Sequence, residues 1–218
     1  WHVMGVTQGA GLSLKWFRDN FCIEEKRTAE LMDTDPYILM DQEAENVEPG
    51  CSGLIYLPYL MGERTPHLDP RAKGVFFGLS AKHEKPHFIR SVMEGVVYSL
   101  RDCLEIIKGM GIDVSQVRAS GGGGKSKLWR QMQADVFGTD IVTISSSEGP
   151  ALGVALLAGV GTGVYSSVPE ACDAVIKVKT VQNANKDLYD KYNKYYNMYK
   201  RLYNSLKKDF YDLADIIE

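Results

Sequence analysis

Four consecutive glycines, Gly121 to Gly124, stand between a segment with the pattern of a strand and a segment with the pattern of a helix. Glycine loses more conformational freedom on folding than any other residue and adds no side chain to a core. A turn usually needs only one residue with positive φ, so a run of four requires a further reason. Main chain without Cβ atoms lets a ligand approach closely, and the start of a following helix attracts negative charge. The run therefore predicts a site for a polyphosphate or an adenosine group, with a flexible surface turn as the alternative.

Two common nucleotide-binding motifs come close to this segment without matching it. Residues 124–126, Gly-Lys-Ser, would complete a P-loop, but Ala119 stands where that motif needs its first glycine. Residues 141–144, the corresponding metal-binding strand, end without an aspartate. A dinucleotide fingerprint that begins at Gly121 would need its third glycine where Ser126 stands. The expected nucleotide would thus be held by neither motif.

Apolar periodicity divides the chain into strands and helices. Strands are predicted at residues 1–6, where alternation begins with the first residue, and at residues 53–60, 116–119 and 140–144. The opening strand needs a pairing neighbour, so we expect the chain to continue a longer one. Helices are predicted at residues 10–21, 86–109 and 128–136, from Pro150 onward, and along the C-terminal segment. Strand, loop and helix repeat twice after residue 115, which indicates an α/β class.

Two further segments carry distinct patterns. Residues 22–50 are acidic and contain Pro36 and Pro49, so they are predicted to form surface helices and loops. The loop at residues 145–149 leads into a helix rich in small residues, which predicts close packing against a neighbour. The C-terminal helix is predicted to pack on the core through one stripe of large side chains, namely Tyr192, Tyr195, Tyr199, Leu202, Leu206, Phe210 and Leu213.

Composition excludes several classes of protein. The net charge is -3, from 25 basic and 28 acidic residues spread along the chain, so nucleic acid is not expected as a partner. The four cysteines are far apart and match neither a metal site nor a disulfide framework. The sequence has no apolar run of about 18 residues and no secretory pattern at its start. A cytoplasmic setting without a membrane partner is therefore expected.

Longer motifs resemble one known family. Gly74-x-Phe76-x-Gly78-Leu79 and, seven residues later, the segment 87–94 (His-Phe-x-x-Ser-Val-Met-Glu) resemble the C-terminal signature of the FGGY carbohydrate kinases, which include xylulose, glycerol and gluconate kinases. Residues 62–70, the glycine run with residues 128–135, and residues 148–153 are similar to the same family in order and spacing. The sequence Glu-Arg-Thr-Pro-His at residues 63–67 is most similar to that of xylulose kinases. At this loop gluconate kinases are more similar to the chain than glycerol kinases are.

The resemblance implies a ribonuclease H-like lobe of the actin-like ATPase fold, with a mixed sheet flanked by helices. Residues 1–218 would form the C-terminal, nucleotide-binding lobe of a two-lobed sugar kinase, with residues 1–20 as the junction to an absent N-terminal lobe. The implied reaction is phosphorylation of a sugar hydroxyl by ATP, first of all of D-xylulose to D-xylulose 5-phosphate. Gluconate or another sugar of the family, and a non-catalytic interaction domain that keeps the fold, are the alternatives.

The resemblance also implies which ligands bind and which lobe holds each of them. ATP or ADP and the sugar would be bound between the lobes, and Mg²⁺ would be held by ligands in the absent lobe. The catalytic base belongs to that lobe as well, so no catalytic residue is assigned here and the chain alone is expected to be inactive. Members of the family suggest a homodimer, but the sequence itself does not determine the oligomeric state.

Site residues follow from the matching positions of the family. The implied nucleotide contacts are Gly11, Lys15, Gly121, Gly122, Gly123, Gly124 and Ser126. Gly122 is the first candidate, Ser126 would offer a hydrogen bond to adenine, and Lys15 would approach the phosphates although some relatives have glutamine there. The charged loop with Glu63, Arg64 and His67 either faces the cleft between the lobes or pairs internally, and both readings stay open.

Overall fold

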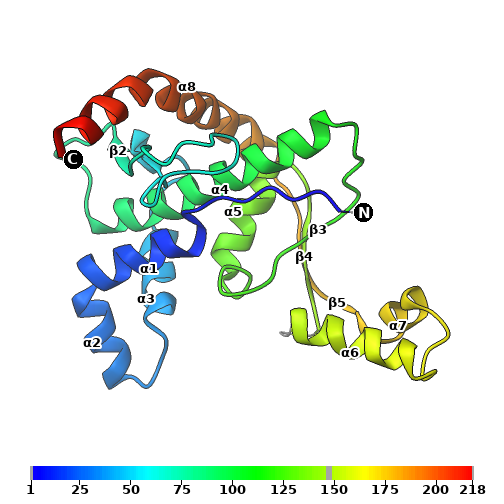
Figure 1. The fold of residues 1–218 in the computed structure, drawn as a ribbon. Helices are drawn as coiled ribbons and strands as arrows, with labels where there is room; N and C mark the ends of the chain where they lie inside the picture. The colour runs from blue at the N-terminus through cyan, green and yellow to red at the C-terminus, as the bar shows by residue number, and fades with distance from the viewer. Residues whose placement is uncertain (1, 146–148, 218) are drawn as a thin grey trace.

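A computed structural model describes residues 2–145 and 149–217. Figure 1 shows a helical body from which a narrow ribbon of strands carries two short helices outward. The helices are α1 (Ala10–Phe21), α2 (Ile23–Leu31), α3 (Pro36–Glu45), α4 (Lys85–Gly109), α5 (Lys127–Phe137), α6 (Pro150–Gly161), α7 (Val168–Val175) and α8 (Lys186–Ile217). The strands are β1 (Ile55–Leu57), β2 (Val75–Phe77), β3 (Val117–Arg118), β4 (Ile141–Ile144) and β5 (Val178–Gln182), and a 3-10 turn, η1, spans Cys51–Gly53.

Helix α4 lies at the centre of the body and packs against α1, α3, α5 and β1. Its start is fixed by a capping box, in which the Glu84 side chain accepts from the His87 backbone and the Glu84 N–H donates to the His87 ring. Pro86 in the first turn favours the same start. Most of the helix from Ile89 to Cys103 is buried, so α4 supplies the core surface on which the other helices pack.

Two small sheets complete the fold. Strands β1 and β2 are antiparallel, with Ile55 opposite Phe77. In the second sheet β4 is central: it runs parallel to β3, with Val117 opposite Ile141, and antiparallel to β5. The result is an α/β fold with a mixed sheet flanked by helices, as predicted.

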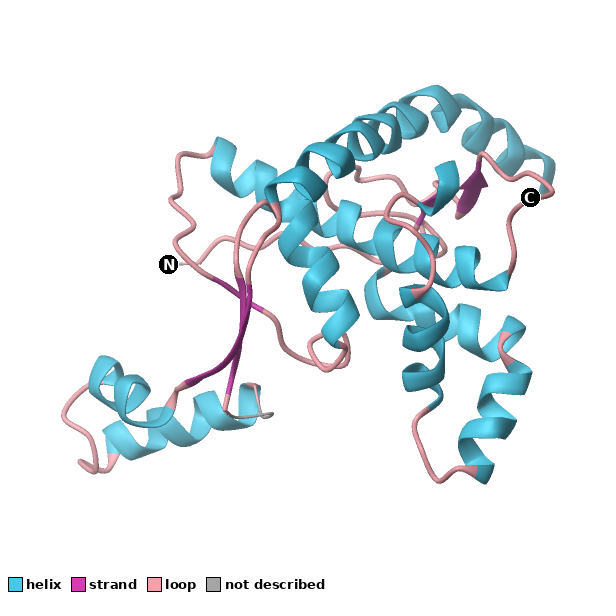
Figure 2. Ribbon diagram, turned by 180° about the vertical axis from the view of Figure 1, so that it is seen from behind, coloured by secondary structure: helices cyan, strands magenta, loops and turns pink. Residues whose placement is uncertain are grey.

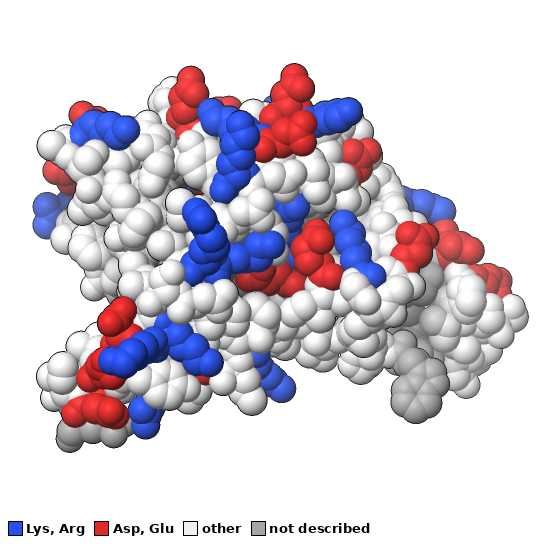
Figure 3. All heavy atoms as spheres, turned by 90° about the horizontal axis from the view of Figure 1, so that it is seen from above, with Lys and Arg blue, Asp and Glu red and all other residues white. Residues whose placement is uncertain are grey.

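Helix α8 covers the body along its whole length (Figure 1). Its buried residues are Tyr192, Tyr196, Tyr199, Leu202, Tyr203, Phe210 and Ala214. The predicted stripe is confirmed at four of these positions, but Leu213 is exposed because the buried face passes through Ala214 instead. Figure 3 shows acidic and basic side chains interspersed over this side of the molecule, so no large field of one sign develops there.

Two strand predictions need correction. The strand expected over residues 53–60 is only Ile55–Leu57, because Gly53 closes the preceding 3-10 turn. The part of the opening segment that is described, residues 2–6, forms no strand. Val6 instead exchanges two hydrogen bonds with Thr65, whose N–H donates to the Val6 carbonyl at 3.0 Å and whose Oγ1 accepts from the Val6 N–H at 3.2 Å. Alternation in a sequence cannot distinguish such an extended segment from a strand. Trp1 lies outside the described residues.

Helices α6 and α7 pack on each other at the end of the β4–β5 ribbon, away from the body (Figure 2). Leu156 is buried, while Val154 and Leu157 are exposed. A Cβ atom at Gly153 would have no neighbour within 4 Å, whereas one at Gly159 would lie 3.1 Å from the Tyr165 ring, so the predicted close packing is found at Gly159 and not at Gly153. Residues 146–148 of the preceding loop lie outside the described residues.

Candidate functional site

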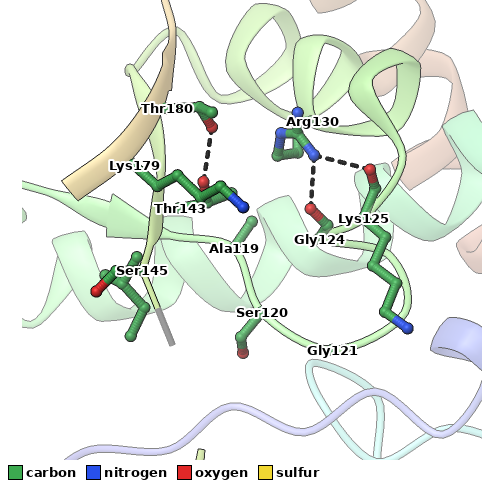
Figure 4. Close-up of a pocket in the computed structure, with 11 residues that line it drawn as sticks. Ala119, Ser120, Gly121, Gly124, Lys125, Arg130, Thr143, Ser145, Lys179 and Thr180 are labelled. Carbon is green, nitrogen blue, oxygen red and sulfur yellow. Dashed lines mark hydrogen bonds between the residues drawn. The ribbon is translucent and has the colours of Figure 1, made fainter. Parts of the chain in front are cut away.

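The glycine loop joins β3 to α5 and is held at both ends. At its start the Ala119 N–H donates to the Val142 carbonyl of β4 at 2.9 Å. At its end Arg130 donates from Nη1 to the carbonyls of Gly124 and Lys125, at 2.6 and 2.9 Å (Figure 4). Its Nε donates to Gln182 of β5 at 2.7 Å. One guanidinium therefore fixes the end of the loop relative to the sheet.

Three of the four glycines are explained by the fold itself. Gly121 has φ of 68°, in the left-handed region that favours glycine. A Cβ atom at Gly123 would lie 3.3 Å from the Trp129 ring, and one at Gly124 would lie 2.9 Å from the Ser120 nitrogen. The number of glycines in the run is thus a weaker sign of a ligand than the sequence suggested.

Gly122 is the exception. Its φ is not positive, and a Cβ atom placed on it would have no heavy atom within 4 Å. The same is true of Gly11, in the first turn of α1. The fold has room for a side chain at both positions, as it has at Gly109, Gly153 and Gly161, so free space alone does not assign a ligand.

Gly11 and Gly122 face the same opening. A cavity of about 450 Å³ lies between α1, α3 and the glycine loop, and an adjoining cavity of about 400 Å³ continues on the other side of the loop toward α4. Both are lined by Gly11, Gly122, Gly123 and Trp129. The two cavities therefore form one groove that passes over the bare main chain of the two glycines.

A third cavity, of about 530 Å³, lies on the face of the loop toward β4 and β5 (Figure 4). Its cationic side chains are Lys125, Arg130 and Lys179. Its hydroxyl groups include Thr143 and Thr180, which hydrogen-bond each other at 2.6 Å. Of these three cations, Arg130 already donates hydrogen bonds to the loop carbonyls, so its guanidinium stabilises the loop.

Five of the predicted contacts, Gly11 and the glycines of the loop, line these cavities, and so does Ser126. The Ser126 side chain caps α5, since its Oγ accepts from the Trp129 N–H at 2.9 Å. Lys15 lines none of the three cavities and instead donates to Asp19, one helical turn away, at 2.7 Å. This hydrogen bond, followed by one from Arg18, lowers the pKa of the half-buried Asp19 carboxyl to about 2. A phosphate contact by Lys15 stays a prediction.

Sequence reasoning missed Asp41. It lies on α3, within the acidic segment expected to be surface, and lines the cavity of about 450 Å³ one helical turn after Tyr37. Burial raises the pKa of the Asp41 carboxyl, and the neighbouring Ser126 hydroxyl opposes that rise. In the sequence, only the four-residue spacing of Tyr37 and Asp41 after Pro36 predicts that both lie on one face of a helix. Such spacing is weak evidence for a site.

The charged loop pairs internally at Glu63. This carboxylate is 3% exposed and accepts from Thr7 Oγ1 at 2.9 Å, the Gln8 N–H at 3.0 Å and the Arg64 N–H at 2.7 Å. It thereby fixes the residues that lead into α1. His67 stacks on Tyr203 with ring centroids 3.5 Å apart, and burial lowers the pKa of His67 to about 4.

Two negative findings apply to residues 2–145 and 149–217. No group of three or more His, Cys, Asp or Glu side chains in these ranges is arranged to hold a metal ion. No helix in them combines the length and the apolar character needed to span a bilayer.

Comparison with known proteins gives relatives along nearly the whole chain. A xylulose kinase of Staphylococcus epidermidis is 37% identical over 216 residues, and a gluconokinase of Bacillus licheniformis is 36% identical over 217 residues. Each alignment covers 99% of this chain but only 42% of the relative. The chain is thus similar to less than half the length of the proteins it matches.

Solved structures agree with these relatives. A ligand-bound xylulose kinase from Lactobacillus acidophilus superimposes with a TM-score of 0.82 at 27% identity, over 95% of this chain and 40% of that one. A Plasmodium falciparum glycerol kinase with ADP superimposes with a TM-score of 0.71 over 88% of this chain and 36% of that one, and at 23% identity it supports the fold alone. Residues 1–162 match the FGGY family of carbohydrate kinases, C-terminal domain. The chain therefore belongs to the FGGY family of carbohydrate kinases.

Proposed function

We propose that this chain is the ATP-binding lobe of a sugar kinase and that the nucleotide lies in the groove over Gly11 and Gly122. The observation that carries the proposal is that these two glycines, which neither backbone conformation nor packing requires, line the same cavities. Residues 1–218 would act together with a second lobe of a longer polypeptide, in which the sugar is bound.

The shape of the groove suits a nucleotide. The cavity between α1 and α3 is lined by Leu14, Tyr37, Ile38 and Trp129, a mainly apolar surface suited to a base. The bare main chain at Gly122 would then let the ribose and phosphates pass over the loop. The positive end of the α5 dipole favours negative charge near the loop.

Transfer of a phosphoryl group depends on positioning and charge stabilisation more than on covalent chemistry, and positioning alone supplies roughly 7–11 kcal/mol of barrier lowering. Orientation of ATP is the part that this chain would perform, with Arg130 keeping the loop in place. When bound, Mg²⁺ neutralises charge on the β- and γ-phosphates. We propose that its ligands and the catalytic base belong to the second lobe.

The proposed sugar is D-xylulose, because xylulose kinases of several bacteria are similar to this chain over most of its length. Gluconokinases are similar to almost the same extent, so gluconate is the alternative substrate. Purified full-length protein assayed with both sugars distinguishes them: a lower kcat/KM for D-xylulose than for gluconate would reject the first assignment.

Calorimetric titration of the chain with ATP and with ADP tests the nucleotide site. Gly122→Val is expected to weaken binding at least tenfold, because the added side chain fills space that the ligand needs, while thermal unfolding changes little because the fold leaves that space empty. Gly109→Val is the matched control, since Gly109 also has open space and ordinary φ but lies at the end of α4 away from the groove. Equal affinity in the wild-type chain and Gly122→Val would remove the loop from the site.

A further inference from the structure

The proposed base cavity contains one acidic side chain that the fold does not use. Two aspartates of α3 line it, Asp35 and Asp41. Asp35 caps the helix, because its carboxylate accepts from the Tyr37 N–H at 3.0 Å. Asp41 lies within the helix, where a carboxylate is not needed as a cap.

Asp41 is also not paired with Lys125, the cation that lines the same cavity. Among the described residues no ion pair involves its carboxylate. The charges that act on it, Glu45 and Asp35, are both acidic and oppose its ionisation. A partly buried carboxylate without a cation is unfavourable unless hydrogen-bond donors compensate it. The neighbouring Ser126 lowers the pKa of the carboxyl, which opposes this cost only in part.

Ser126 already serves the fold. Its oxygen accepts from the Trp129 N–H at 2.9 Å, which caps α5. The carboxylate oxygens of Asp41 can therefore accept a hydrogen bond from a base in the cavity. Leu14 and Ile38 give the cavity apolar walls, and Lys125 lines it as well.

Adenine carries one exocyclic donor, its 6-amino group, and a carboxylate is a suitable acceptor for it. We propose that Asp41 accepts a hydrogen bond from the 6-amino group of adenine and is the residue of this site that selects the base. This assignment rests on the proposed nucleotide site and adds to it the group that recognises the ligand.

The test compares two ligands that differ only in the amino group, ATP and purine riboside 5′-triphosphate, by calorimetry on the wild-type chain and on Asp41→Ala. The wild-type chain is expected to bind ATP at least about tenfold more tightly than the analogue, the usual size of a hydrogen bond to a charged group. Asp41→Ala is expected to bind both ligands equally. Asp41→Asn, which keeps the shape and a neutral acceptor, is expected to retain a smaller preference.

Glu45→Ala is the matched control, because it removes one negative charge from the same helix without changing the lining of the cavity. It is expected to keep the wild-type preference for ATP. A preference that is undiminished in Asp41→Ala, or absent in the wild-type chain that still binds ATP, overturns the role of Asp41 and leaves the groove intact. An equal loss of both ligands in Asp41→Ala assigns Asp41 to loop support instead. Binding of neither ligand by the wild-type chain overturns the nucleotide site itself.

Discussion

Glu94 is enclosed by donors from three parts of the chain. Its carboxylate is 2% exposed and accepts from Arg90 Nε at 2.9 Å, from the Gly50 N–H at 3.0 Å and from the Tyr192 hydroxyl at 3.1 Å. Arg90 also donates to the Tyr192 oxygen, at 3.1 Å. The pair joins α4 to α8 and to the turn that follows α3, and each partner is satisfied by several bonds.

Removal of this carboxylate should be costly. Glu94→Ala is expected to lower the free energy of unfolding by about 3–5 kcal/mol, because it leaves the buried Arg90 charge without its partner. Urea unfolding followed by circular dichroism measures the change. Asp212→Ala removes a carboxylate from the exposed pair with Lys208 and is expected to leave stability unchanged within error. Similar losses in the two variants would contradict the structural role of Glu94.

Residues of the site differ in how far the sequence could reveal them. The glycine run was recognisable, because no other residue type allows such an approach to the main chain. The reason for each glycine was not, since the contact of Gly123 with Trp129 and of Gly124 with Ser120 depends on how the loop folds back. Asp41 was not recognisable either, because its lack of an ion pair is a property of the packed helices.

At the scale of elements, α6 contains neighbouring leucines with opposite environments. Leu156 is 7% exposed and Leu157 is 59% exposed. Helix α6 makes its main contacts with α7, so its anchoring depends on a few side chains. Such a unit is expected to open more readily than the body.

Leu156→Ala should therefore speed hydrogen exchange of the α7 amides, because it removes buried contact between the two helices. Leu157→Ala is the matched control and is expected to leave those rates unchanged, as most exposed substitutions change stability by less than about 0.5 kcal/mol. Exchange measured by mass spectrometry on peptides of 168–175 checks both. Faster exchange in Leu157→Ala would indicate that this residue is covered in solution.

The long helices were the most predictable elements. Residues 86–109 were expected as a helix and form α4, because the apolar spacing, Pro86 and the capping residues all favour the same start. Short strands were less predictable. Residues 2–6 alternate as a strand would, yet their partner is the Thr65 loop rather than a neighbouring strand, and only the tertiary fold decides between the two.

For the whole molecule, Asp102 links stability to pH. Burial raises the pKa of its carboxyl to about 6, although the Tyr196 hydroxyl donates to Oδ1 at 2.6 Å. Among the described residues Oδ2 has no hydrogen-bond partner. The unfolded chain therefore loses this proton at lower pH than the folded chain, so the contribution of Asp102 to stability falls as pH rises from about 4 to about 6.

Asp102→Asn keeps the acceptor for Tyr196 and cannot ionise. The variant is expected to equal the wild-type chain below about pH 4 and to exceed it by roughly 1–3 kcal/mol above about pH 6. Urea unfolding at several pH values measures the difference, and the effect of His67, whose low pKa acts in the opposite direction, is present in both proteins. A difference that does not change with pH would show that the Asp102 carboxyl ionises normally in the fold.

The buried carboxylate of Glu63 has a mechanical consequence for the groove. It holds Thr7 and Gln8 against the loop at residues 62–67, and Val6 is bonded to Thr65 beside them. A displacement of the residues before Val6 would have to break these hydrogen bonds before it moved Gly11. The position of Gly11 is therefore insulated from movement of the residues before Val6, and the anchored carboxylate of Glu63 contributes to this.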